Sequence, residues 1–249
     1  MNYSDVLKNI TTPLTAPAYP MPPYRFYKRE YLNITYRTDL EALKKVVPEP
    51  LEVVEPLVRF EVMKMPDVTG LGDYSESGQV IPVRFNGEEG DYFHSMYVNS
   101  LPAIVAGREA GAYPKKLGSP NLYVDSDTLV GTLDYGSLRV ANATMGYKHS
   151  PLDKEKAREE ICRPNYMIKI IPDYNGELRI CELARTQIKD IEILGAWTGP
   201  ARLQLFEHVL APMADLPVLE VVSASHILTE LTLSPFEVIH DYLKENKQK

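Results

Sequence analysis

The segment "LVRFEVMKM" (residues 57–65) alternates apolar and polar side chains, which is typical of a β-strand. One face of this strand would carry Val58, Phe60 and Val62. The opposite face would carry Arg59 and Glu61, which are either in contact with solvent or directed into the interior of a barrel. In the second case the two charges are buried and need partners.

Eight further segments mix β-branched or aromatic residues with polar ones in the same way, and turn residues separate them. They are residues 31–37, 79–85, 91–98, 128–135, 137–147, 165–171, 178–184 and 188–194. "DYGS" (134–137) and "DYNGE" (173–177) are typical of hairpin connections. We therefore expect extended segments to dominate the chain.

Helical signals are fewer, and each consists of a capping residue or a first-turn proline before a helical pattern. They lie at residues 38–47, 150–161, 199–210 and 234–245. Five prolines within residues 1–24 exclude a regular helix there and predict an extended N-terminal arm. The pattern predicts a mainly β (β-rich α+β) fold, a single domain over residues 1–249, as a closed or nearly closed barrel with a few helices outside it.

Composition restricts the function classes. The net charge of -7 argues against a nucleic-acid surface, and no run of about 18 apolar residues predicts a membrane span. The first residues, "MNYSDVLKNI", do not form a secretory signal. Only two cysteines, Cys162 and Cys181, occur, which favours buried structural thiols and a reducing cytoplasm.

Motifs for metals and nucleotides are not found in the sequence. The five histidines lack metal-ligand spacing, and neither cysteine sits in a C-x-x-C pair. There is no dinucleotide fingerprint, phosphate-binding lysine loop or nucleophile elbow. "GLGDYSESG" (70–78) contains glycines at other spacings and is interpreted as a mobile or tightly turned loop. These absences favour a reaction that needs neither a metal nor a nucleotide.

The stretch "GREAGAYPKKLGSP" (107–120) sets two lysines, Lys115 and Lys116, in an apolar context. A lysine amine attacks carbonyl carbons only when it is neutral, and its ordinary pKa is about 10.4. Burial in an apolar pocket or a neighbouring cation can lower that pKa. Pro114 favours an extended backbone, which would send the two amines to opposite sides, so we expect burial to matter more than Lys116. A solvated turn is the alternative.

Seven segments together resemble the acetoacetate decarboxylase family, in particular its clostridial-type members. They are "YRFYKREYLNITYRTDLEALKKVVPEPLE", "PLVRFEVMKMPDVTGLGDYSESGQVIPV", "EAGAYPKKLGSP", "DSDTLVGTLDYG", "ATMGYKHSPLD", "ICRPNYMIKIIP" and "AWTGPARLQLFEH". They lie in the family's order and cover nearly the whole chain. The resemblance implies a conical closed antiparallel β-barrel, a large homo-oligomer (a dodecamer), a small-molecule keto acid substrate and no cofactor.

The resemblance also implies roles for individual residues. Lys115 matches the amine that forms a Schiff base, and Lys116 matches its neighbour. The other implied catalytic residues are Arg29, Glu61 and Glu76, and the implied substrate-binding residues are Tyr113 and Met96. In this scheme Glu76 steers the substrate carboxylate by repulsion, Arg29 holds Glu76 in place, and Glu61 assists proton transfers.

The expected activity is that of a carboxy-lyase that converts acetoacetate to acetone and CO2 through an imine and an enamine. Two alternatives stay open at this point. One is a Schiff-base aldolase-dehydratase or cyclase acting on another keto acid. The other is a barrel that binds a small ligand without catalysis.

Overall fold

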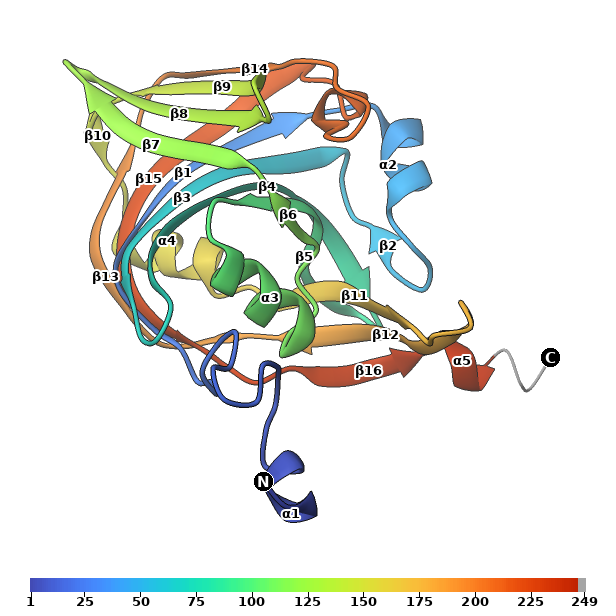
Figure 1. Ribbon diagram of the computed structural model, residues 1–249. Coiled ribbons are helices and arrows are strands. Elements are labelled where there is room, and N and C mark those ends of the chain that lie inside the picture. Colours follow the sequence, from blue (N-terminus) through green and yellow to red (C-terminus); the bar gives the residue numbers. More distant parts are fainter. Residues whose placement is uncertain (246–249) are drawn as a thin grey trace.

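The structure is a computed structural model that describes residues 1–245, and strands dominate it (Figure 1). A large sheet curls through most of a turn around a central space (Figure 1). Its strands are, in hydrogen-bonded order, β10 (Ser150–Pro151), β13 (Ile188–Thr198), β15 (Glu220–Leu233), β1 (Arg25–Arg37), β3 (Leu57–Val68), β4 (Gly72–Phe85), β5 (Glu88–Val98), β11 (Asn165–Pro172), β12 (Leu178–Thr186) and β16 (Glu237–Asp241). The short strands β2 (Glu52–Val53) and β6 (Lys115–Leu117) pair with β4 and β5. The predicted mainly β class is therefore confirmed.

The prediction of a closed antiparallel barrel is wrong on two points. Within residues 1–245 no ladder joins β10 to β16, so the hydrogen-bonded order stays open. In addition, β5 pairs in parallel with both β6 and β11. Helix α3 (Leu101–Glu109) connects β5 to β6 and brings the chain back alongside the last residues of β5, Met96 to Val98, which makes this pair parallel.

A smaller antiparallel sheet packs on one face of the large one. It consists of β7 (Ser119–Asp125), β8 (Thr128–Tyr135), β9 (Leu138–Gly146) and β14 (Ala201–Leu205). A Cβ on Gly131 of β8 would lie 2.9 Å from Val62 Cγ2 and 3.1 Å from Leu32 Cδ2, so the two sheets are in close contact there. The face of β3 with Val58, Phe60 and Val62 belongs to this core.

The other face of the large sheet forms a second core, and two helices take part in it. Ala103 and Ala106 of α3 and Ala157 of α4 (Lys154–Ile161) cluster with Met63 and Met65 of β3. Both helices are framed by the curved sheet (Figure 1). The expectation that the helices lie outside the sheet is therefore wrong for α3 and α4, because their small apolar residues pack against its concave side.

The helix predictions had mixed outcomes. Residues 38–47 contain the expected helix, α2 (Leu40–Val46), whose N-cap Asp39 accepts from Ala42 N at 2.7 Å. Residues 150–161 contain α4, but Asp153 caps it, and Ser150–Pro151 form strand β10. Residues 199–210 contain the strand β14 (Ala201–Leu205) instead of a helix.

The last predicted helix, residues 234–245, is β16 followed by a short helix α5 (Tyr242–Glu245). Helix α3, strand β15 and the 3-10 turn η1 (Met213–Asp215) were not expected from the sequence. The expected hairpins at 134–137 and 173–177 connect β8 to β9 and β11 to β12, and each contains a glycine with positive φ.

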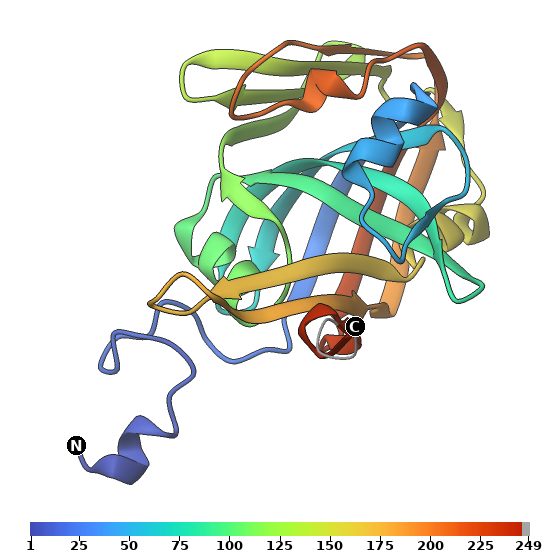
Figure 2. The same ribbon diagram turned by 90° about the vertical axis from the view of Figure 1, so that its right-hand side faces the viewer.

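The N-terminal arm is not wholly extended, since α1 (Tyr3–Val6) forms one helical turn before the first proline. The arm projects from the rest of the molecule (Figure 2). It is tied to α3 by Thr11 Oγ1 and Tyr19 Oη, which donate to Glu109 Oε2 at 2.8 Å and 3.2 Å.

Cys162 and Cys181 are free and half-buried, so the expectation of fully buried thiols is not met. No helix in the described part of the chain has the length and apolar character needed to cross a membrane.

Candidate active site

Lys115 begins strand β6, which pairs in parallel with β5 so that Met96 lies beside it. Its side chain is 7% exposed, and its Nζ forms an ion pair with Glu76 Oε1 at 2.5 Å. The amine also lies over the rings of Tyr113 and Tyr74, 5.2 Å and 5.7 Å from the centroids. The amine is thus enclosed by two aromatic rings and a carboxylate.

Lys116 points the other way, as the extended backbone predicts. Its Nζ donates to Leu210 O at 2.5 Å and lies 5.1 Å from the ring centroid of Tyr135. The residue is exposed. Its amine therefore has a different set of contacts from that of Lys115.

Glu76 lies in strand β4, so the interpretation of residues 70–78 as a loop is wrong from Gly72 onward. Gly70 and Gly72 both have φ of +73°, and they form the turn between β3 and β4. From Gly72 the chain pairs with β3, with Glu76 opposite Met63. This places Glu76 on the concave side of the sheet, where it is 3% exposed.

Arg29 reaches the same space because β1 contains a bulge. The register between β1 and β15 shifts between Phe26 and Arg29, and Lys28 has φ of +52°. A bulge inserts one residue and re-aims the side chains that follow. Phe26 and Arg29, three positions apart, consequently line one cavity.

The Arg29 guanidinium is held by aromatic rings and a sulfur atom. Its Cζ lies 5.0 Å and 4.7 Å from the ring centroids of Phe26 and Tyr31, and Nη2 donates to Met63 Sδ at 2.8 Å. Among the described residues, Arg29 has no ion pair with Glu76, although the Glu76 carboxylate is one of the groups that raise the pKa of Arg29, so the expectation that Arg29 holds Glu76 in place stays a prediction. The Arg29 Nε is buried and has no hydrogen-bond partner among residues 1–245.

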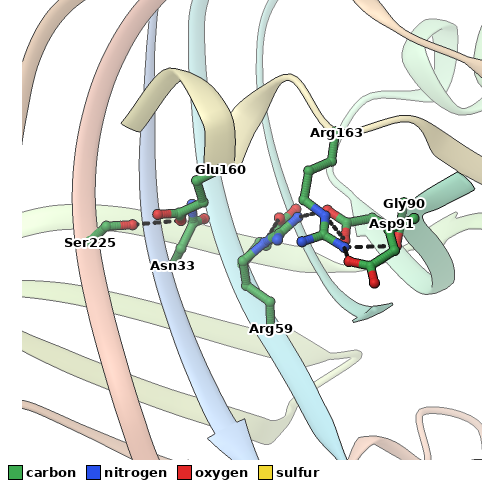
Figure 3. Close-up of polar contacts among 9 residues, drawn as sticks. Asn33, Arg59, Gly90, Asp91, Glu160, Arg163 and Ser225 are labelled. Atoms are coloured by element: carbon green, nitrogen blue, oxygen red, sulfur yellow. Dashed lines mark hydrogen bonds and ion pairs between the residues drawn. The ribbon is translucent and has the colours of Figure 1, made fainter. Parts of the chain in front are cut away.

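Glu61 belongs to a buried series of alternating charges, of which Figure 3 labels Arg59, Asp91 and Arg163. Arg59 Nε contacts Glu61 Oε1 at 2.6 Å, and Arg59 Nη2 contacts Asp91 Oδ2 at 2.7 Å. Arg163 Nε lies 3.1 Å from Asp91 Oδ1 and is nearer the surface. These are the partners that buried charges on β3 require. Burial raises the pKa of Glu61, and the Arg59 guanidinium opposes that rise.

A second polar cluster lies beside this series in the same close-up (Figure 3). Glu160 of α4 accepts from Asn33 Nδ2 of β1 and from Ser225 Oγ of β15, each at 2.7 Å. The cluster fastens α4 to the concave side of the sheet, and nothing in the sequence pattern indicated it.

Two adjoining cavities meet at Lys115. The first, of about 40 Å³, is polar, and Arg29, Glu61, Glu76, Met96, Tyr113 and Lys115 contribute to its wall. The second, of about 220 Å³, is mainly apolar and lies against α3. Phe26, Tyr74, Tyr113, Lys115 and Leu233 line both. The structure thus brings together all the predicted catalytic and substrate-binding residues except Lys116.

Sequence reasoning missed several residues of the polar cavity. Tyr74 and Tyr31 could have been predicted from the sequence, because each is two positions from a predicted site residue on the same strand and so shares its face. Asn165 comes from β11, which carries no predicted site residue, and Phe93 lies three positions from Met96 on β5, where a register shift interrupts the alternation. Burial raises the pKa of Tyr31 to about 12, and the pKa of Tyr113 is also raised by burial. Both phenols therefore stay neutral at ordinary pH and can donate a hydrogen bond.

In the part of the chain that the structure describes, no group of three or more His, Cys, Asp or Glu side chains is placed to hold a metal ion. The site instead combines a buried amine, two carboxylates, a guanidinium and neutral phenols. A buried amine with proton-accepting groups beside it is suited to forming an imine with a carbonyl substrate.

Known proteins are similar to this chain over nearly its whole length. A family profile described as "Acetoacetate decarboxylase (ADC)" matches residues 11–243. An acetoacetate decarboxylase of Clostridium botulinum is 68% identical over 243 residues, which is 97% of this chain and 99% of the relative. One from Clostridium acetobutylicum is 65% identical over 240 residues, covering 96% of this chain and 98% of the relative.

A solved structure reported as "Structural Studies of Acetoacetate Decarboxylase" superposes with a TM-score of 0.96 at 64% identity. The match covers 98% of this chain and 100% of that one. The likeness therefore extends over the arm, both sheets and the strands that carry the buried amine. The chain belongs to the acetoacetate decarboxylase family.

Proposed function

We propose that this chain decarboxylates acetoacetate to acetone and CO2, and that Lys115 carries the reaction as an imine. Membership in the family and identities of 65–68% to curated acetoacetate decarboxylases supply the reaction class, that of a carboxy-lyase. The observation that supports the role of Lys115 is the position of its Nζ. That atom is buried where the two cavities meet and is 2.5 Å from a carboxylate.

The chemistry proceeds by addition and elimination at the ketone carbon. The neutral amine of Lys115 adds to this carbon, and loss of water leaves an iminium ion. The bond to the carboxylate carbon then breaks, CO2 leaves, and the electron pair moves through the methylene carbon to the iminium nitrogen. The resulting enamine takes a proton on carbon, and water releases acetone and restores the amine.

Glu76 is the proton acceptor for Lys115 in this scheme, because its Oε1 contacts Nζ directly. Arg29 is the attractive partner of the substrate carboxylate, since it lines the cavity and its buried Nε has no hydrogen-bond partner in the described part of the chain. The ionised form of Glu76 repels a carboxylate, so the substrate's charged end lies towards Arg29. The wider apolar cavity next to α3 excludes water from the carbonyl end of the substrate.

Trapping the imine tests the proposal directly. Borohydride added with acetoacetate reduces an imine to a stable amine, and we expect peptide mapping to find the added mass on Lys115. Acetone in the headspace then distinguishes a decarboxylase from an aldolase-dehydratase or a cyclase. Absence of any label on Lys115 would leave only the binding-protein alternative.

Replacing Glu76 tests the proton acceptor. Glu76→Gln keeps the shape of the side chain but cannot take a proton, and we expect kcat/KM to fall about 10²-fold. The measurement is the initial rate of acetone formation, with Glu52→Gln on the exposed strand β2 as the matched control. Equal rates in wild type and Glu76→Gln would remove Glu76 from the mechanism.

Glu61 gives a prediction about pH. Burial raises its pKa, so Glu61 keeps its proton to a higher pH than an ordinary glutamate, and the protonated fraction falls as the pH rises through that value. If Glu61 donates the proton to the enamine, kcat should fall as the pH rises through this pKa. Glu61→Gln should lower kcat about 10²-fold and abolish this fall of kcat with rising pH. If kcat of Glu61→Gln still falls with rising pH as in wild type, another group is the proton donor.

Three further expectations belong to this proposal. The family resemblance supports assembly into a large homo-oligomer and action in the cytoplasm on a small keto acid. The single domain over residues 1–249 stays a prediction. Light scattering of the purified protein measures the assembly.

A further inference from the structure

Gly107 lies in helix α3, in contact with the side chain of Lys115. A Cβ placed on Gly107 would be 2.6 Å from Lys115 Cδ, 2.8 Å from Cε and 3.2 Å from Nζ. Carbon atoms in contact are normally about 3.5–4.0 Å apart. The aliphatic stem of the lysine therefore occupies the space that any side chain at position 107 would need.

The backbone around Lys115 is tied to the same helix. Tyr113 N donates to Gly107 O at 3.0 Å, and Lys115 N donates to Tyr113 O at 2.8 Å. Arg108 Nη1 donates to Lys115 O at 3.3 Å. These bonds hold strand β6 against α3, so the two elements resist separating to admit a methyl group. The lysine side chain is the part that has to move.

Glycine inside a helix is unfavourable relative to alanine, because it loses more backbone entropy on folding. Gly107 is followed by Arg108 and Glu109 within α3 and is thus no terminal capping glycine. Its φ is not positive, so backbone conformation does not require glycine there either. The close approach of the lysine stem is the feature that does.

We propose that Gly107 is a positioning residue for the catalytic amine: its bare Cα lets the Lys115 stem lie flat on α3, which places Nζ against Glu76 and at the junction of the two cavities. The catalytic part of this inference rests on the proposed function. A methyl group at position 107 displaces the stem by about 1 Å, and a displacement of that size can cost on the order of 10²-fold in rate.

The kinetic experiment uses Gly107→Ala in the full chain. We expect kcat/KM for acetoacetate to fall about 10- to 10²-fold. The rate of borohydride-trapped labelling at Lys115 should fall with it, and its pH profile should shift because Nζ leaves its contact with Glu76. Gly195→Ala is the control, since its Cβ would lie 2.4 Å from the Trp197 ring and disturb packing away from Lys115. That variant should lose thermal stability without a change in the pH profile.

A thermal double-variant cycle tests the contact without any activity assay. In Lys115→Ala the stem is absent, so adding Gly107→Ala should raise the Tm by about 2–4 °C, the gain of alanine over glycine in a helix. With Lys115 present, Gly107→Ala should raise the Tm less, or lower it. Wild type, the two single variants and the double variant are compared at one protein concentration, because assembly would make the Tm depend on that concentration.

The outcomes separate the two proposals. Equal Tm changes in both backgrounds, or a Gly107→Ala rate within twofold of wild type in an active enzyme, would overturn the role of Gly107. Non-additive Tm changes in a protein that neither labels at Lys115 nor forms acetone would uphold the steric contact and remove the decarboxylase function instead. If Gly107→Ala does not fold while Gly107→Ala/Lys115→Ala does, the Lys115 side chain is what excludes a methyl group at position 107, and the steric contact is supported.

Discussion

Lys115→Arg is expected to abolish acetoacetate decarboxylation, with a loss of at least about 10⁴-fold in kcat, or about 5.5 kcal/mol in the activation barrier. A guanidinium does not lose its proton in proteins, so it cannot form the imine on which the electron pair depends. The substitution keeps a positive charge near Glu76, which limits its effect on folding. The measurements are acetone formation and borohydride labelling.

Lys116→Arg is the matched control for this experiment. The guanidinium introduced at position 116 would still donate to the carbonyl of Leu210 and stack on Tyr135, the two contacts that Lys116 makes. We expect this variant to keep most of the activity, within about fivefold of wild type, a difference of about 1 kcal/mol. Comparable losses in the two variants would refute the unequal roles that their opposite orientations indicate.

Asp91→Ala is expected to destabilise the fold by about 3–5 kcal/mol, a large part of the roughly 5–15 kcal/mol typical of a folded domain. Asp91 is 1% exposed and is the carboxylate between Arg59 and Arg163. Its removal leaves the Arg59 guanidinium buried with Glu61 as its remaining ion-pair partner. The measurement is the change in unfolding free energy in urea.

Two comparisons make the Asp91 result specific. Asp91→Asn keeps the shape and part of the hydrogen bonding, so it should cost less than Asp91→Ala. Glu220→Ala breaks an exposed pair with Arg37 and should change stability by less than about 1 kcal/mol. A small effect of Asp91→Ala would mean that water satisfies the two guanidinium groups. Activity in Asp91→Asn then reports whether Arg59 still holds Glu61 in place.

Much of the fold could be predicted from the local sequence pattern, and the predictions that were wrong have a common cause. The nine strands expected from alternation are present, because alternation shows which faces a strand buries. The segment 199–210 shows helix-start residues, yet it is β14, since Ala201 to Leu205 pair with β9. Helix α3 lacks strong amphipathicity because the residues that it buries, Ala103, Ala106 and Gly107, are small. Tertiary contacts overrode local propensity in both cases.

The sequence by itself determined that the chain is mainly β, that it resembles one enzyme family over nearly its whole length, and that Lys115 and Lys116 project oppositely after Pro114. These follow from period, spacing and local backbone preference, which act over a few residues. Only the tertiary structure decided which charges meet. The bulge at Lys28 aims Arg29 at Met63, β4 carries Glu76 to Lys115, and Gly107 admits the lysine stem. Each depends on a contact between two different helices or strands, and the local sequence pattern of one element does not specify its neighbour.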